Sequence, residues 1–442
     1  AAYAGGFSMI WTCIGCSLGV MFNWLVLAPR LRVKAEQYGA LTIPDFLEAR
    51  FNDRTHIVRI VSVITILLFY ATYISAQFIA AGKVFDTVFV EVGMPWGQTE
   101  TWSYYRQGLL IGAVIILGYT AIGGFLAVCW TDFVQAILMI AAVVVLPIVG
   151  ISRMGGLEAL WTALASAAEN DIMLAVDNGK TGASFTFGVV LAGLAWGVGY
   201  PGQPHIAARF MAIRDPRKIP QSALISVTWT LFALYGSMFV GLVALGVLGP
   251  ELATNGSADR AMPMLALELL PPLVAGIVLS AAVAAMMSTV DSQLIVAVAA
   301  VVRDVYEKLL GGHPSGTVAV WLSRAVLIGM GAGGVALAWG GKSVFDTVLD
   351  AWSGLAAGLG PAIVLGCVWK GASRNGVIVG MIAGVLLTQF WGSIMGALTA
   401  AGGTSAAIVP HLNAVELIVC VGVNLLLTVL ISLASPPSRV NR

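Results

Sequence analysis

The residues that most directly suggest chemistry interrupt an apolar stretch at positions 199–204, with the sequence GYPGQP. Each proline lacks an N–H and clashes with the carbonyl four residues before it, so we expect the carbonyls of Gly197 and Tyr200 to lose their helical partners. Polar backbone at membrane depth is tolerated only where it lines a cavity or is buried in protein. A helix that resumes near His205 would direct its positive N-terminal end into the gap, which suits a carboxylate. The interruption therefore predicts a binding site for a small solute.

Oxygen-bearing residues form a second candidate set within the apolar run 273–302, whose only charge is Asp291. At about 100° per residue, an arc of about 160° on one helix holds the whole set: Ala285, Ser288, Thr289, Asp291 and Ser292. Hard alkali cations take clustered oxygen ligands without nitrogen or sulfur, so this face predicts a sodium site. The residues support one alternative equally well. The hydroxyls would bond back to carbonyls one turn earlier, and Asp291 would pair with a cytoplasmic arginine.

Three further features concern polar or aromatic residues in apolar runs. Asp132 follows the glycine pair at 123–124 by eight residues, and we expect it at a depth similar to that of Asp291. Trp196 and Tyr200 are four residues apart, so they share a helix face that enters the interruption, where they would line a pocket or pack together. Lys83 and Asp86 are one turn apart and predict a local ion pair.

The composition defines the elements that must position these residues. The chain has 442 residues, of which 59% are hydrophobic and 10% charged, with a mean hydropathy of +0.91. We therefore predict an all-α polytopic membrane protein. A bilayer core requires about 20 apolar residues per helix. The candidate runs, taken to be about eleven transmembrane helices, are 4–28, 57–82, 107–122, 124–151, 185–199 continued by 203–212, 221–248, 273–302, 319–339, 343–369, 376–397 and 412–434.

Basic residues in the loops predict the orientation. Placing the loop 29–56 in the cytoplasm puts most of the 23 Lys and Arg residues on that side, with residue 1 outside. In the same loop, residues 41–48 (LTIPDFLE) predict a short interfacial helix capped by Thr42, with a plain connector as the alternative. The net charge of +1 gives no indication of a nucleic-acid partner. We expect a single membrane domain, monomeric in the lipid bilayer.

Three segments resemble the sodium:solute symporter family, with the strongest likeness to its bacterial sodium/proline branch. They are GGFLAVCWTDFVQA (123–136), LAWGVGYPGQPHIAARFMAIRDP (194–216) and AAMMSTVDSQL (284–294). The likeness covers nearly the whole chain. The second segment is specific to the proline branch, whereas strings such as WTD and MST occur across the family.

The resemblance implies a leucine-transporter-type fold, with two inverted repeats and the solute at the midplane. Residues 1–152 would hold the remaining helices of the first repeat, residues 185–369 the second repeat and residues 370–442 two accessory helices. It also implies that Na+ drives import of a small amino acid, L-proline above all, across the inner (plasma) membrane of a bacterium. Other small carboxylate or betaine-like solutes remain alternatives.

Site roles follow from the same resemblance. The main sodium site would use Ala285, Ser288 and Thr289, and a second sodium-linked region would use Asp132 with Ser292; we add Asp291 to this set. The substrate region would comprise the following residues of the interrupted helix and one aromatic residue facing it: Trp196, Tyr200, Gln203, Pro204 and Tyr73.

Two departures from the family pattern matter. Position 291 more often holds a small hydroxyl residue, so Asp291 adds a negative charge that would strengthen cation binding or accept a proton. Family members also have two helices before the point where this sequence begins, the second of which is unwound and donates carbonyls to sodium. We expect these two helices to be missing from the sequence as given rather than from the protein.

Two other function classes compete with transport. A nutrient sensor built on a transporter-like module would need an output domain, and the sequence stops soon after residues 435–438 (SPPS). A membrane enzyme would need a nucleophile, a base and an orienting group, and no such set is evident. We therefore expect a transporter and not an enzyme.

Overall fold

The computed structural model describes residues 1–95, 99, 102–123, 125–167, 182–254, 257–401, 412 and 415–435. Every regular element in these ranges is helical. The α-helices are α1 (Ala2–Gly5), α2 (Ile10–Phe22), α3 (Ala28–Tyr38), α4 (Ile43–Phe51), α5 (Ile57–Val92), α6 (Tyr104–Gly123), α7 (Phe125–Met154), α8 (Leu157–Ala167), α9 (Gly182–Val198), α10 (Pro204–Met211), α11 (Ile219–Leu248), α12 (Glu251–Thr254), α13 (Ala261–Leu269), α14 (Pro272–Ala299), α15 (Gly316–Ala338), α16 (Val344–Val368), α17 (Arg374–Gln389), α18 (Trp391–Ala400) and α20 (Glu416–Ala434). Short 3-10 or π segments connect or extend them: η1 (Gly6–Met9), η2 (Asn23–Leu27), η3 (Tyr200–Gly202), η4 (Pro216–Lys218), η5 (Ala258–Arg260) and η6 (Ala300–Leu309).

The apolar runs form the predicted membrane helices. Within the described residues, nine helices are long and apolar enough to cross a bilayer. A tenth span is the pair α17 and α18, which bends by 59° at its junction. The eleventh run is the interrupted one, which forms α9, η3 and α10 in succession. The all-α polytopic class is therefore confirmed.

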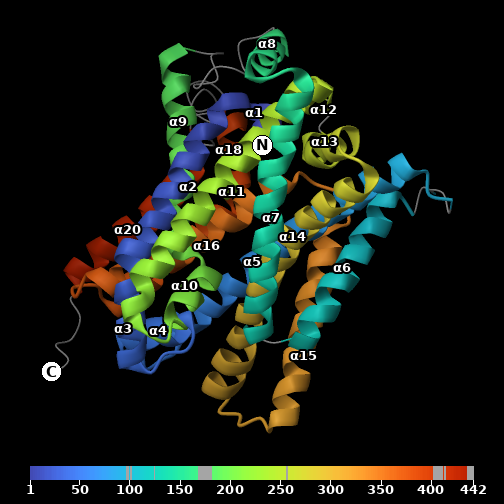
Figure 1. Cartoon of the computed structure of the whole chain (residues 1–442). Helices are drawn as coiled ribbons and strands as arrows, with labels where there is room; N and C mark the ends of the chain where they lie inside the picture. The colour runs from blue at the N-terminus through green and yellow to red at the C-terminus, as the bar shows by residue number, and fades with distance from the viewer. Residues whose placement is uncertain are drawn as a thin grey trace.

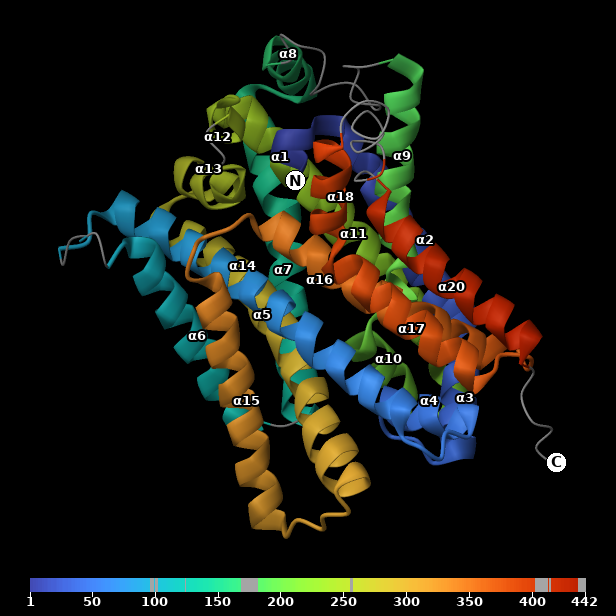
Figure 2. The same ribbon diagram turned by 180° about the vertical axis from the view of Figure 1, so that it is seen from behind.

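One helix, α16, lies at the centre of the assembly. In its most apolar window 89% of the residues are buried, the largest share among the candidate spans of the described chain. It packs against α5, α17, α20 and the interruption at η3 (Figure 1). Seen from the other side, α16, α17 and α20 run together, while α14 and α15 form a long hairpin at the opposite end of the molecule (Figure 2). The central helix therefore connects the interrupted span to the rest of the bundle.

Small residues allow the helices to approach closely around α17. A Cβ atom at Gly384 would lie 2.1 Å from the carbonyl oxygen of Ala357 on α16, and one at Gly380 would lie 2.1 Å from Thr428 Oγ1 on α20. Such contacts hold helices together in lipid, where water exclusion does not contribute. In α15, by contrast, Gly329 and Gly333 have no neighbour within 4 Å of an added Cβ. Glycine spacing therefore marks packed faces only on some of the helices.

The short helix predicted for residues 41–48 is present as α4 (Ile43–Phe51). Thr42 is its N-cap, and its hydroxyl accepts a hydrogen bond from the backbone N–H of Asp45 at 3.1 Å. Pro44 stands in the first turn, where a missing N–H costs nothing. This local chemistry explains why a short polar loop between two membrane spans folds into a helix.

The local ion pair predicted between Lys83 and Asp86 is wrong. Lys83 Nζ lies 2.6 Å from the carboxylate of Asp259, and the Asp86 carboxylate lies 2.5 Å from the guanidinium of Arg260. Both partners come from η5, in the segment that precedes α13. Two crossed pairs therefore attach this outer segment to α5. The helical spacing could not show this, because the competing partners arrive from a distant part of the chain.

Candidate solute and sodium sites

The interrupted span forms its break where the prolines predict it. The carbonyl of Tyr200, which Pro204 deprives of its helical donor, accepts a hydrogen bond from Asn23 Nδ2 at 3.0 Å. The Gly199 carbonyl accepts one from Gln203 Nε2 at 3.2 Å. The Tyr200 and Gly199 carbonyls also accept the backbone N–H groups of Gln203 and Gly202, so the side-chain amides add to the hydrogen bonds of the 3-10 turn. The break is held by η2 on one side and by its own Gln203 on the other.

Trp352 of α16 packs against the break. Its ring centroid lies 4.8 Å from that of Tyr200 and 5.9 Å from that of Trp196, and its Nε1 donates to the Trp196 carbonyl at 3.2 Å. A Cβ at Gly199 would lie 1.9 Å from Trp352 Nε1, so only glycine fits there. Trp196 and Tyr200 share a face as predicted, and in this structure that face is covered by Trp352.

Tyr73 and Pro204 lie on the α10 side of the break, around His205. The ring of Tyr73 meets the His205 ring edge-on, with centroids 6.3 Å apart. The Tyr70 hydroxyl accepts the backbone N–H of His205 at 2.9 Å, and this N–H is the first that α10 can offer after Pro204. The positive end of α10 is therefore already occupied by a neutral hydroxyl.

Unpaired polar atoms gather at the break. Among the described residues, the buried Asn23 Oδ1 and Gln203 Oε1 at the break have no hydrogen-bond partner, and neither has the buried Ser353 Oγ, one residue after Trp352 in α16. Gln203 itself has no exposed surface, and its Nε2 lies 3.4 Å from the carbonyl of Trp352, the neighbour of Ser353. Buried polar atoms are paired in most proteins, so a group of unpaired ones requires an explanation. A polar ligand would supply the missing partners.

The predicted sodium ligands on α14 fall into two groups. In the first, the hydroxyls of Ser288 and Thr289 both donate to the Ala285 carbonyl, each at 3.0 Å. The three oxygens thus lie together, although in the back-bonded arrangement that the alternative predicted. Ala285 and Thr289 also line a cavity of about 420 Å³, to which Trp229 and Asp259 contribute. The donor set is all oxygen, which suits an alkali cation.

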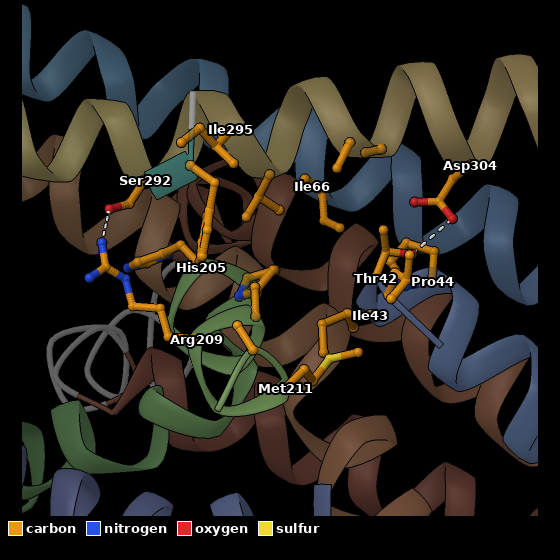
Figure 3. A pocket seen from close by; sticks show the side chains of 18 of the residues that line it. Thr42, Ile43, Pro44, Ile66, His205, Arg209, Met211, Ser292, Ile295 and Asp304 are labelled. Carbon is orange, nitrogen blue, oxygen red and sulfur yellow. Dashed lines mark hydrogen bonds between the residues drawn. The ribbon is translucent and has the colours of Figure 1, made fainter. Parts of the chain in front are cut away.

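In the second group, which contains Ser292, an arginine side chain lies beside the predicted sodium ligands. The guanidinium of Arg209, on α10, lies 2.5 Å from Asp132 Oδ2 and 2.6 Å from Ser292 Oγ (Figure 3 shows the Ser292 contact). Asp132 Oδ1 is buried and has no partner among the described residues. The alternative expected an arginine at Asp291, but Arg209 pairs with Asp132 instead and lies beside Ser292.

A second cavity, of about 250 Å³, opens beyond Ser292 toward α4 (Figure 3). Its walls come from the start of α4, from α10 and from the last turns of α14. His205, Arg209 and Asp304 are its ionisable lining residues, and most of the others are apolar. The oxygen-bearing stretch of α14 thus runs between two cavities, one lined by Thr289 and the other by Ser292.

Asp291 does not join the other predicted ligands. It has no exposed surface, and its carboxyl group is hydrogen-bonded to the hydroxyls of Tyr119 and Thr120 on α6. Ser292, one residue on, faces Arg209 instead. Successive residues on a helix point about 100° apart, and α14 has neighbours on several sides, so the predicted arc is divided among different helices. The structure brings Asp132 to Ser292 but not to Asp291.

Sequence reasoning missed three residues that shape these sites: Asn23, Arg209 and Trp352. Asn23 carried a usable signal, because it is an isolated amide in an otherwise apolar run. Arg209 lies in a segment assigned to the cytoplasmic side, where an arginine is ordinary. Trp352 reaches the break only through the packing of α16, which no local pattern encodes.

Comparison with known proteins identifies the family. The model of the sodium:solute symporter family matches residues 1–384. The sodium/proline symporter of Escherichia coli (strain K12) is 37% identical over 398 residues, covering 88% of this chain and 75% of that protein. The high-affinity proline transporter PutP of Bacillus subtilis (strain 168) is 34% identical over 393 residues, with 88% and 79% covered.

Two solved structures share the fold. A Na+-coupled sialic acid symporter in a substrate-bound outward-open state superposes with a TM-score of 0.72 at 15% identity, over 99% of this chain and 86% of that one. MhsT in complex with L-phenylalanine gives a TM-score of 0.56 at 14% identity, over 96% and 92%. The leucine-transporter-type fold is therefore confirmed. Because the matched residues include the break and both oxygen-bearing segments, the chain belongs to the sodium:solute symporter family.

Proposed function

We propose that this protein imports a small amino acid, L-proline above all, by coupling its movement to sodium. The observation that carries the proposal is the break at η3, where the buried side-chain oxygens of Asn23 and Gln203 have no hydrogen-bond partner among the described residues. Relatives at 37% and 34% identity, named as a sodium/proline symporter and a proline transporter, support the substrate class. The protein would act as a monomer in a bacterial plasma membrane.

The solute would bind between α16 and the break. Its ammonium or imino group would donate to the unpaired oxygens of Gln203 and Asn23, which accept only N–H or O–H groups. Its carboxylate would approach the first turn of α10, where Tyr70 now accepts the His205 N–H. Its apolar ring would contact Trp196, Tyr200 and Tyr73. Since Trp352 covers the first two of these in this structure, binding requires that α16 and the break move relative to one another.

Sodium would bind the oxygens of Ala285, Ser288 and Thr289 once the two hydroxyls turn their lone pairs to the ion. At the second region, sodium would compete with Arg209 for Asp132 and Ser292. Coupling follows if sodium favours the state in which the solute also binds, because each ligand then raises the affinity for the other by the same factor. In this proposal residues 1–152 belong to the first repeat, residues 185–369 to the second and residues 370–442 to the accessory helices.

Uptake into proteoliposomes tests the proposal. Purified protein is reconstituted, and radiolabelled L-proline is added outside with sodium or with choline as the cation. Accumulation above equilibrium in the sodium arm alone is the expected result. Equal uptake in both arms contradicts sodium coupling. Binding without accumulation indicates a sensor, and a chemically altered product indicates an enzyme. A parallel panel of glycine betaine and small carboxylates identifies the preferred solute.

A further inference from the structure

A third cavity lies beside the break and has no role in the sites above. Its volume is about 370 Å³, and its walls come from α2, from α9 and η3, from α16 and from α20. Pro201 of the break and Pro361 of α16 contribute to it, and every other lining residue is a glycine, valine, leucine or phenylalanine. No lining side chain therefore offers a charge or a hydrogen bond to a polar solute. We call this cavity the apolar groove.

The apolar groove opens to the surface that lipid covers. Of its lining residues, Leu18 on α2 is 55% exposed and Leu425 on α20 is 42% exposed. Both lie in helices that are long and apolar enough to cross a bilayer. Exposed leucines at this depth contact acyl chains, which are as apolar as the leucine side chain itself. The chemistry of the groove thus suits an acyl chain.

Basic side chains gather where α16 ends, beside α3 and α4 (Figure 2). Lys34 of α3 and Arg50 of α4 both donate to the carbonyl of Gly366 in the last turn of α16, at 3.1 Å and 2.9 Å. The charges of Arg30 on α3 and of the exposed Lys370 also act on Lys34. We call these four residues, Arg30, Lys34, Arg50 and Lys370, the basic cluster.

The basic cluster lacks an acidic counterpart. Among the described residues, none of its four members forms an ion pair with a carboxylate. The acidic residues of α3 and α4 are paired elsewhere, since Glu36 pairs with Arg32 and Glu48 with Arg59. The carbonyls at the end of α16 supply only a partial negative charge. The cluster therefore has a net positive charge that suits an anion.

The apolar groove and the basic cluster adjoin one another along two helices. Lys370 is six residues beyond Val364, a lining residue, which corresponds to about 9 Å at 1.5 Å per residue. Arg30 is eight residues beyond Phe22, another lining residue, or about 12 Å by the same rise. Its guanidinium donates back to the Val26 carbonyl at 2.8 Å, so it turns toward the groove. One leaflet contributes about half of a hydrocarbon core about 30 Å thick. A phosphate at the cluster therefore places an acyl chain of the same molecule in the groove.

We propose that the apolar groove and the basic cluster together bind one anionic phospholipid of the membrane, with an acyl chain in the groove and the phosphate at Arg30 and Lys370. Basic pockets between membrane helices recognise anionic headgroups in this way. A zwitterionic lipid would add a cation to a cluster that already has four, and a free phosphate would leave the groove unused. The bound chain contacts Pro201, so this lipid touches the break itself. The proposal does not require that the transported solute be proline.

Native mass spectrometry of the purified full chain tests the charge of the bound lipid. The protein is titrated with phosphatidylglycerol or with phosphatidylethanolamine that carries the same acyl chains. We expect the wild type to retain one phosphatidylglycerol in clear preference to phosphatidylethanolamine. Arg30→Gln and Lys370→Gln should each reduce that preference about fivefold. The matched control is Lys308→Gln, at an exposed lysine near the end of η6 that has no ion pair among the described residues, and it should leave the preference unchanged.

Two neighbouring leucines of α20 test the groove. Leu425 lines it and Leu426 does not, and both are exposed, so a tryptophan at either position leaves the core intact. Leu425→Trp should fill the groove and weaken the binding of both lipids, whereas Leu426→Trp should bind them as the wild type does. Excess inorganic phosphate should not displace the lipid. Equal retention of the two lipids by the wild type would overturn the proposal, as would an unchanged preference in Arg30→Gln and Lys370→Gln. Full displacement by phosphate would show a site for a free anion and would overturn it too.

Discussion

The proposed sodium site depends on the direction in which the hydroxyl hydrogens of Ser288 and Thr289 point. Both hydroxyls now donate to the Ala285 carbonyl, and rotation about one side-chain bond in each would present lone pairs to an ion instead. We expect Ser288→Ala and Thr289→Val to raise the sodium concentration for half-maximal uptake roughly tenfold each. Loss of a polar partner to a charged group costs about 1.5–3 kcal/mol, and 1.4 kcal/mol corresponds to a factor of ten. Sodium titration of proline uptake measures the effect.

The same helix offers a matched control for this prediction. Ser280 donates to the Gly276 carbonyl in the same back-bonded geometry, at 2.8 Å, but lies on an exposed part of α14. Ser280→Ala should therefore leave the sodium titration unchanged. If Ser280→Ala shifted the titration as far as the other two variants, the effect would come from helix stability rather than from ion ligation.

At the scale of elements, the break between α9 and α10 depends on Pro204. Alanine at this position would restore an N–H that can donate to the Tyr200 carbonyl, in competition with Asn23. We expect Pro204→Ala to rewind the break and to lower the apparent affinity for the solute about tenfold, while the midpoint of thermal unfolding stays the same or rises. Pro216→Ala, in the first turn of the short segment η4, is the control and should leave affinity unchanged. Reduced affinity that accompanies a lower unfolding midpoint would instead indicate general damage.

The elements also show which features a sequence can predict. The break at Pro204 and the cap at Thr42 were predictable, because proline geometry and capping act within a few residues. The partners of Asp291 and Lys83 were not, because they are chosen by helices and segments far away in the sequence. The hydroxyl cluster on α14 lies between these cases. Helical spacing placed Ser288 and Thr289 together, but only packing shows that Asp291 faces another helix.

At the scale of the whole molecule, a group of charged residues joins the elements around α4. Arg59 lies 2.8 Å from Asp45 and 2.8 Å from Glu48, and it also pairs with Asp304 of η6. Arg303 reaches Asp45 at 2.8 Å. Burial by itself raises the pKa of Asp45, but hydrogen bonds from Arg303 and Arg59 leave it below its ordinary value. The pKa of Glu48 is lowered against burial in the same way, by Arg59 and His56. The cluster thus links α4, the start of α5 and the end of the α14 stretch.

The last prediction concerns the pH dependence that this cluster imposes. A carboxyl group with a lower pKa in the folded than in the unfolded chain stabilises the fold above its unfolded pKa, about 4, and that contribution is lost as the pH falls below it. Arg59→Gln leaves Asp45, Glu48 and Asp304 with too little positive charge, so we expect the free energy of unfolding near pH 7 to fall by about 3–5 kcal/mol. On acidification, the variant should lose less additional stability than the wild type loses. Thermal unfolding in detergent across this pH range measures both effects. Arg54→Gln, an exposed residue of the same cytoplasmic linker, should behave as the wild type does. If Arg59→Gln were as stable as the wild type at pH 7, Arg59 would not be needed to hold the three elements together, and the Arg303–Asp45 pair would suffice to join η6 to α4.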